Sequence, residues 1–213
     1  MYPSQALPAV PLLWGWVCVR KHKTQPARAG QSLPWGQLPD LPGEGTFLPC
    51  VWTDPIPAVF AVGASGGVGT TTLASLCGLV DFGRAWPVSA PQAARCVVVA
   101  RTTATSMAAA RECAGAVFGG RVAGVECLGL VLVADQPGRL PRELARARAL
   151  TESVFPRAWV VPYSQAIRLG KDDPQLAAHK TVQELRGLAN VGEEEPEVFI
   201  DDIPAVGGVS LDI

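Results

Sequence analysis

A glycine-rich segment constrains the fold of this chain more than any other stretch. Gly63-Ala-Ser-Gly-Gly-Val-Gly-Thr-Thr-Thr72 follows a short apolar run at 59–62 and precedes an alanine- and leucine-rich stretch at 73–80. The apolar run predicts a buried strand, and the later stretch predicts a helix. Glycines let successive backbone N–H groups turn inward, and a helix N-terminus adds partial positive charge. The segment therefore predicts either a phosphate-binding turn or a tight turn that only joins a strand to a helix.

Compared with the phosphate-loop pattern G-x-x-x-x-G-K-[ST], the segment keeps Gly69 and Thr71 but has Thr70 where the pattern has lysine. The backbone cradle is present, and the cation of the pattern is missing. Arg84 and Arg101 are candidates to supply positive charge from outside the loop. The predicted phosphate-binding residues, with Thr71 also a candidate Mg²⁺ ligand, are Gly63, Ser65, Gly66, Gly67, Val68, Gly69, Thr70, Thr71 and Thr72.

Apolar runs and helix-like stretches alternate from residue 58 onward. Runs that are apolar at every position suit strands covered on both faces, and regular alternation with helices indicates a parallel sheet. We therefore predict an α/β fold with a doubly wound parallel sheet in a Rossmann-like three-layer arrangement. The predicted strands are 59–62, 96–100, 128–133 and 158–161, and the predicted helices are 70–80, 105–118, 140–153 and 175–189.

Composition divides the chain into three parts. Residues 1–57 are rich in proline and tryptophan, residues 58–192 form the predicted α/β domain, and residues 193–213 form an acidic tail. The net charge of −1 conceals this division, because residues 58–192 hold 14 basic and 9 acidic side chains while the tail holds 7 acids and no base. A basic body with an acidic tail is the resulting electrostatic pattern.

Both terminal parts are candidates to bind a protein partner. In the N-terminal arm, Trp14, Trp16, Trp35 and Trp52 are either anchors for a partner or a cover for the domain's own apolar edge. A start codon placed too far upstream is a third explanation of this arm. The tail is either a short linear motif centred on residues 198–200 or a segment that folds back on the basic body.

Cysteine and hydropathy patterns favour a soluble, cytoplasmic protein. Cys77, Cys96 and Cys127 lie in apolar runs and are expected to be buried thiols, and no C-x-x-C spacing indicates a metal site. The apolar stretch 6–19 contains two prolines and is too short to span a bilayer. Its basic residues follow the apolar run, whereas a signal peptide carries them in front. We expect no membrane partner.

The glycine loop and its flanks resemble the deviant Walker A motif of the ParA/MinD family of P-loop ATPases, whose pattern is K-G-G-x-G-K-[ST]. The similar stretch is Ala61-Val-Gly-Ala-Ser-Gly-Gly-Val-Gly-Thr-Thr-Thr-Leu-Ala74, with Ser65 and Thr70 at the two lysine positions. Within that family, the loop most resembles those of the CpaE/TadZ-type variants, which have G-G-x-G-T-T. The resemblance implies a shortened P-loop NTPase-like fold, a bound ATP or ADP with Mg²⁺, and a homodimer. The matching loop positions are Gly66, Gly67, Gly69 and Thr71.

Two further segments support the resemblance, and one is missing. Residues 97–107 resemble the family's later strand and helix, and residues 159–163 resemble the segment that approaches the nucleotide base. Between the loop helix and Cys96 the family has a switch region, whereas residues 81–95 read as turns. Asp135 is open to three interpretations: a relocated Walker B residue, a base-side residue, or the cap of the helix that begins near residue 140. Pro162 and Tyr163 are further base-side candidates.

Arg139, Arg142 and Arg146 are spaced to share one face of a helix. Such a stripe neutralises DNA phosphates in proteins that bind DNA without sequence specificity, but a solvated helix face is the commoner explanation.

Three functions are consistent with these observations. The leading hypothesis is a catalytically impaired ParA/MinD-like protein that acts as a scaffold or as a localisation or partition accessory factor and binds nucleotide without efficient hydrolysis. The first alternative is an active ATPase that uses Asp135 as its Walker B residue. The second alternative is a DNA-associated partition-like protein that uses the basic stripe.

Overall fold

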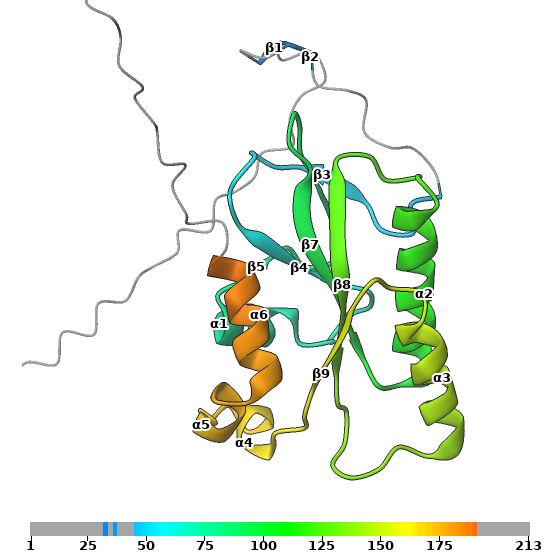
Figure 1. The fold of residues 1–213 in the computed structure, drawn as a ribbon, viewed down its shortest axis with the longest axis vertical. Coiled ribbons are helices and arrows are strands. Elements are labelled where there is room, and N and C mark those ends of the chain that lie inside the picture. Colours follow the sequence, from blue (N-terminus) through cyan, green and yellow to red (C-terminus); the bar gives the residue numbers. More distant parts are fainter. Residues whose placement is uncertain (1–31, 34–35, 38–44, 191–213) are drawn as a thin grey trace, which may run out of the picture.

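A five-stranded parallel sheet forms the centre of the molecule (Figure 1). We analysed a computed structural model, which describes residues 32–33, 36–37 and 45–190. All four strand pairings within this sheet are parallel. In spatial order the strands are β5 (Val80–Asp81), β4 (Val59–Gly63), β7 (Ala94–Arg101), β8 (Val125–Val133) and β9 (Ala158–Val161).

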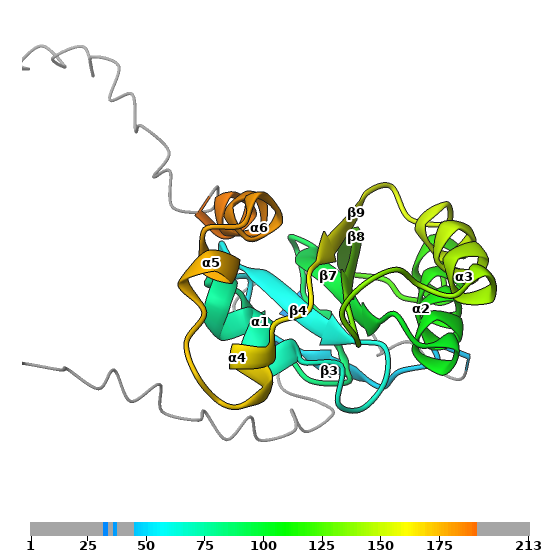
Figure 2. The same cartoon turned by 90° about the horizontal axis from the view of Figure 1, so that it is seen from below.

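Helices cover both faces of this sheet, so the domain has three layers. Figure 2 shows α1 (Thr70–Cys77) and α6 (Lys180–Asn190) on one side, and α2 (Ala104–Phe118) and α3 (Arg142–Glu152) on the other. Two short helices follow β9: α4 (Gln165–Arg168) and α5 (Pro174–Ala177). The prediction of an α/β fold with a mainly parallel, Rossmann-like sheet is confirmed.

The alternation of side chains along β7 explains the two covered faces. Cys96, Val98 and Ala100 enter the core beneath α2, whereas Val97 and Val99 enter the core beneath α1 and α6. All five side chains are fully buried. A strand with two buried faces needs apolar residues at every position, which is why this run shows no polar alternation.

The order of the strands creates a topological switch point between β4 and β7. After β4 the chain passes through α1 to β5 on one side of β4, and β7 then lies on the other side. In open parallel sheets, ligands bind at the carboxyl ends of the strands beside such a point. The glycine loop leaves β4 at this point.

The segment just before the predicted boundary at residue 57 packs against the domain. Strand β3 (Cys50–Trp52) pairs in parallel with β6 (Trp86–Val88), and Leu48 is only 2% exposed. The indole Nε1 of Trp86 donates a hydrogen bond of 3.0 Å to the carbonyl oxygen of Thr46. The domain therefore begins by residue 46.

The prediction that residues 81–95 contain only turns is wrong. Asp81 ends strand β5, which pairs with β4, and residues 86–88 form β6. Each of these strands has two or three residues, so neither produces a recognisable hydrophobic period.

Some predictions about the terminal parts lie outside the described residues. These include the anchoring roles of Trp14, Trp16 and Trp35 and both interpretations of the tail at 193–213. The partly buried Trp52 packs against the core beneath α2, as the self-covering interpretation predicts. Within residues 32–33 and 36–37, β1 (Ser32–Leu33) pairs antiparallel with β2 (Gly36–Gln37).

Two findings bear on the predictions about cysteines and membranes. Cys77, Cys96 and Cys127 are buried free thiols, as predicted. Burial raises the pKa of Cys77 to about 11. Among the described helices, none has the length and apolar character that crossing a bilayer requires.

Candidate functional site at the carboxyl edge of the sheet

The glycine loop connects the end of β4 to the start of α1. Gly67 and Gly69 have φ angles of 68° and 94°, in the left-handed region that glycine adopts without strain. Gly69 is the N-cap residue of α1, and no side chain makes a capping hydrogen bond there. The side chain of Val68 is buried between α1 and the sheet and fixes the loop. The first N–H groups of α1 have no partner within the helix, so they are available to an anion.

Gly63 brings the loop close to the segment that follows β5. Its N–H donates a hydrogen bond of 2.7 Å to the carbonyl oxygen of Gly83. A Cβ atom at Gly63 would lie 3.2 Å from the Thr70 side chain and 3.3 Å from the same carbonyl oxygen. The absence of a side chain at Gly63 therefore permits the close approach of these two segments.

Thr71 and Asp81 form the closest polar pair at the loop. The Thr71 hydroxyl donates a hydrogen bond of 2.6 Å to Oδ2 of Asp81, and Oδ1 accepts one of 3.0 Å from the N–H of Gly83. Asp81 ends the strand next to β4, and its carboxylate is exposed. A hydroxyl and a carboxylate in contact supply the oxygen ligands that Mg²⁺ prefers, so the residues fit such an ion.

Sequence reasoning missed Asp81, although a weak signal was present. Val80-Asp81-Phe82-Gly83 is a short apolar run that ends in an aspartate and is followed at once by a glycine. The run is too short to predict a strand, and only the pairing with β4 places its carboxylate beside Thr71.

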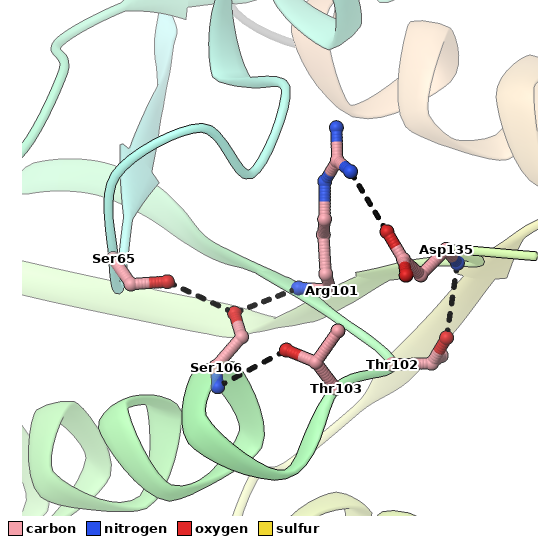
Figure 3. A network of polar contacts seen from close by, with 6 residues as sticks. All are labelled: Ser65, Arg101, Thr102, Thr103, Ser106 and Asp135. Atoms are coloured by element: carbon pink, nitrogen blue, oxygen red, sulfur yellow. Dashed lines mark hydrogen bonds and ion pairs between the residues drawn. The ribbon is translucent and has the colours of Figure 1, made fainter.

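Ser65, at the first family lysine position, connects the loop to α2. Its Oγ lies 3.1 Å from Oγ of Ser106, which also accepts a hydrogen bond of 2.9 Å from the N–H of Arg101 (Figure 3). Ser106 lies in the first turn of α2, whose N-cap is Thr103. This chain of hydrogen bonds crosses the switch point from the loop to the end of β7.

Arg101 and Asp135 form an ion pair across the carboxyl ends of β7 and β8. Nη1 of Arg101 lies 2.8 Å from Oδ1 of Asp135, and the two side chains are 39% and 36% exposed. The backbone N–H of Asp135 donates to the hydroxyl of Thr102 at 3.0 Å (Figure 3). The interpretation of Asp135 as a helix cap is wrong, because α3 begins after Pro141.

A cleft of about 240 Å³ lies between α1, the ends of β7, β8 and β9, and α4. Its α1 wall is mainly apolar, its α4 wall carries Arg168, and Arg101 and Asp135 line it on the side of the sheet. The structure thus brings all three base-side candidates into one cleft with part of the loop. The predicted residues that line it are Val68, Gly69, Thr72, Asp135, Pro162 and Tyr163.

The basic stripe lies away from this cleft. Arg142 and Arg146 are exposed on α3, and Arg139 is exposed just before it. A separate shallow groove is lined by Arg139, Arg142 and Arg148, but not by Arg146. Nothing in the described part of the chain tests DNA binding at this face, so DNA binding stays a prediction.

The fold and the site together define a class of protein. It is a three-layer α/β protein whose parallel sheet presents a glycine-rich, strand-to-helix turn and an adjoining cleft at its carboxyl edge. Residues 57–185 match the model described as "Family of unknown function (DUF6668)", and the chain belongs to this family. Comparison with the curated proteins and with the solved structures found no match.

Proposed function

We propose that this protein binds a nucleotide such as ATP or ADP at the glycine loop without efficient hydrolysis, and acts as a scaffold or as a localisation or partition accessory factor. The contact between Thr71 and Asp81 is the observation that carries the proposal. A tight turn that only joined a strand to a helix would not need a hydroxyl and a carboxylate held 2.6 Å apart beside it.

The loop and the cleft suit different parts of a nucleotide. The open N–H groups at the start of α1 suit phosphate oxygens, and Thr71 with Asp81 would hold Mg²⁺ beside them. The adjoining cleft offers an apolar slot with a polar rim, which suits a base and a sugar. When bound, Mg²⁺ would neutralise charge on the phosphates.

Turnover is the step that this site does not support. Phosphoryl transfer depends on positioning and on cations that neutralise the β- and γ-phosphates. Ser65 and Thr70 occupy the two lysine positions of the ParA/MinD pattern. Loss of one preorganised electrostatic group commonly lowers the rate by about 10²–10³-fold. We therefore expect binding to persist and hydrolysis to be slow.

The proposal is tested by calorimetric titration of the full-length protein with ATP and ADP, with and without Mg²⁺. We expect Mg²⁺ to tighten ATP binding. Asp81→Asn should weaken ATP binding in the presence of Mg²⁺ by about tenfold or more, as loss of a metal-site group does, and so remove most of this gain. Asp54→Asn is the matched control, because Asp54 is exposed and precedes β4, whereas the glycine loop follows that strand. Absence of both heat and thermal stabilisation with millimolar nucleotide would refute nucleotide binding.

The same protein preparation tests the ATPase alternative. An ATPase with Asp135 as its Walker B residue requires that Asp135→Ala abolish ATP turnover. Asp135 pairs with Arg101, whereas Asp81 is the carboxylate in contact with Thr71. We expect wild type and Asp135→Ala to share the same background rate.

A further inference from the structure

We propose that Arg101 supplies the phosphate-binding cation of this site, in place of the missing loop lysines. The inference rests on the proposed function, in that the anion it recognises is a phosphate group held at the glycine loop. It assigns the positive charge to the end of a central strand instead of to the loop itself.

The position of Arg101 is fixed relative to the loop. Arg101 ends β7, which pairs with the loop strand β4. Its backbone N–H donates to Ser106, and Ser106 contacts Ser65 of the loop (Figure 3). Its side chain lines the same cleft as Gly69 and Thr72. The backbone of Arg101 is therefore held beside the loop, and Asp135 orients its guanidinium.

Only part of the guanidinium is in use. Nη1 is bonded to Asp135, whereas Nε is buried and has no hydrogen-bond partner among the described residues. A buried, unpaired N–H group of a charged side chain is costly unless a ligand satisfies it. The edge formed by Nε and Nη2 has the spacing of two phosphate oxygens, so a phosphate group that reached this edge would satisfy both donors.

Asp135 holds this arginine ready but competes with an anion. The carboxylate orients the guanidinium through the 2.8 Å contact, and the hydrogen bond from its backbone to Thr102 fixes the end of β8. Its negative charge also lowers the attraction between Arg101 and a phosphate. Asp135 is thus a positioning residue, and its neutralisation should tighten anion binding.

Other cations near the site are placed less well for this role. Arg168 also lines the cleft, but from α4, and its neighbours Ile167 and Ser164 belong to the wall formed after β9. Arg84 is exposed and does not line the cleft. Among the described basic residues of the cleft, Arg101 alone is connected to the loop by hydrogen bonds.

The test compares ATP with inorganic tripolyphosphate, which carries phosphate groups but neither base nor sugar. The full-length protein and the variants Arg101→Gln, Arg101→Lys and Asp135→Asn are titrated with both ligands in a calorimeter. Arg95→Gln is the matched control, because Arg95 lies on the same strand near its amino end and is also partly buried. It makes the same change in charge at the opposite edge of the sheet.

We expect Arg101→Gln to weaken the binding of both ligands by about 10- to 100-fold, as loss of hydrogen bonds to a charged group does. Arg101→Lys should recover only part of this loss, because an ammonium group lacks the planar fork. Asp135→Asn should tighten binding by up to about fivefold, the range of a partly exposed ion pair. Arg95→Gln should bind as wild type does.

The outcomes separate this inference from the proposed function. Equal affinity of wild type and Arg101→Gln for ATP would overturn the role of Arg101 and leave nucleotide binding intact. Binding of tripolyphosphate that depends on Arg101, without binding of ATP or ADP, would support the phosphate site and refute the proposal of nucleotide binding. If Arg95→Gln weakened binding of the two ligands as much as Arg101→Gln does, the net charge of the protein would explain the effect, and the inference would be overturned.

Discussion

The N-terminal limit of the domain gives a prediction that the structure makes quantitative. Deletion of residues 1–44 keeps Thr46, Leu48 and β3, whereas deletion of residues 1–57 removes them. We expect the first deletion to retain the stability of the full chain and the second to lower it strongly. The reason is that Leu48 and β3 complete the core beneath α2, against Trp86.

Two contacts set the minimum size of the effect. Loss of a buried leucine side chain costs about 2–5 kcal/mol, and Leu48 is only 2% exposed. The hydrogen bond from Trp86 to Thr46 contributes about 0.5–1.5 kcal/mol more. The sum is at least ~2.5 kcal/mol, a large share of the ~5–15 kcal/mol of a folded protein. For a chain of this size, this corresponds to a fall in Tm of at least about 5–10 °C.

Thermal and urea unfolding followed by circular dichroism measures this difference. Leu48→Ala in the full-length chain isolates one contact and should lower the free energy of unfolding by about 2–5 kcal/mol. Phe47→Ala is the control. The side chain of Phe47, next to Leu48, is 46% exposed, so its removal should change the free energy of unfolding by less than about 0.5 kcal/mol. Equal midpoints for the two deletions would refute the assignment of residues 46–52 to the domain.

Three further predictions follow from individual contacts. Gly129→Ala places a Cβ atom 2.4 Å from the carbonyl oxygen of Arg157, so it should lower the Tm or prevent folding, which thermal unfolding checks. Burial raises the pKa of Cys77 to about 11 and that of Cys113 to about 12, so both thiols should resist iodoacetamide at pH 8 until urea unfolds the protein, as judged by mass spectrometry. Hydrogen bonds lower the pKa of Asp173, the N-cap of α5, below its usual value. The contribution of Asp173 to stability is complete above the usual pKa of an aspartate and disappears as the pH falls through the lowered pKa. Asp173→Ala should therefore show a weaker dependence of Tm on pH in this acidic range.

The long elements were predictable because burial on two faces leaves a strong pattern. The apolar runs at 96–100 and 128–133 lie within β7 and β8, and the helix predicted at 105–118 is α2 with one residue added at its start. The short strands β3, β5 and β6 were not predictable in the same way. With two or three residues each, they exist because of their pairing partners, and the sequence does not state those partners.

The same distinction applies to the candidate site. The glycine loop is a local feature, and the sequence shows the glycines that allow positive φ angles at Gly67 and Gly69. The contact of Asp81 with Thr71 depends on a pairing between two strands, and the pair of Arg101 and Asp135 joins residues 34 positions apart. Pairings of this kind decide where charges meet, and they become visible only once the order of the strands is known.

The placement of charge in this site bears on what a bound nucleotide would do. A loop lysine follows the phosphates along the loop, whereas Arg101 is attached to a central strand and shares its charge with Asp135. In the proposed site such a paired guanidinium would hold a phosphate in the ground state, but with its charge shared it would contribute little to neutralising the charge that shifts towards the leaving group in the transition state. If the site binds a nucleotide as proposed, this arrangement would favour occupancy over turnover. In the proposed scaffold role occupancy alone would suffice, because a ligand that binds only the folded state stabilises it by mass action.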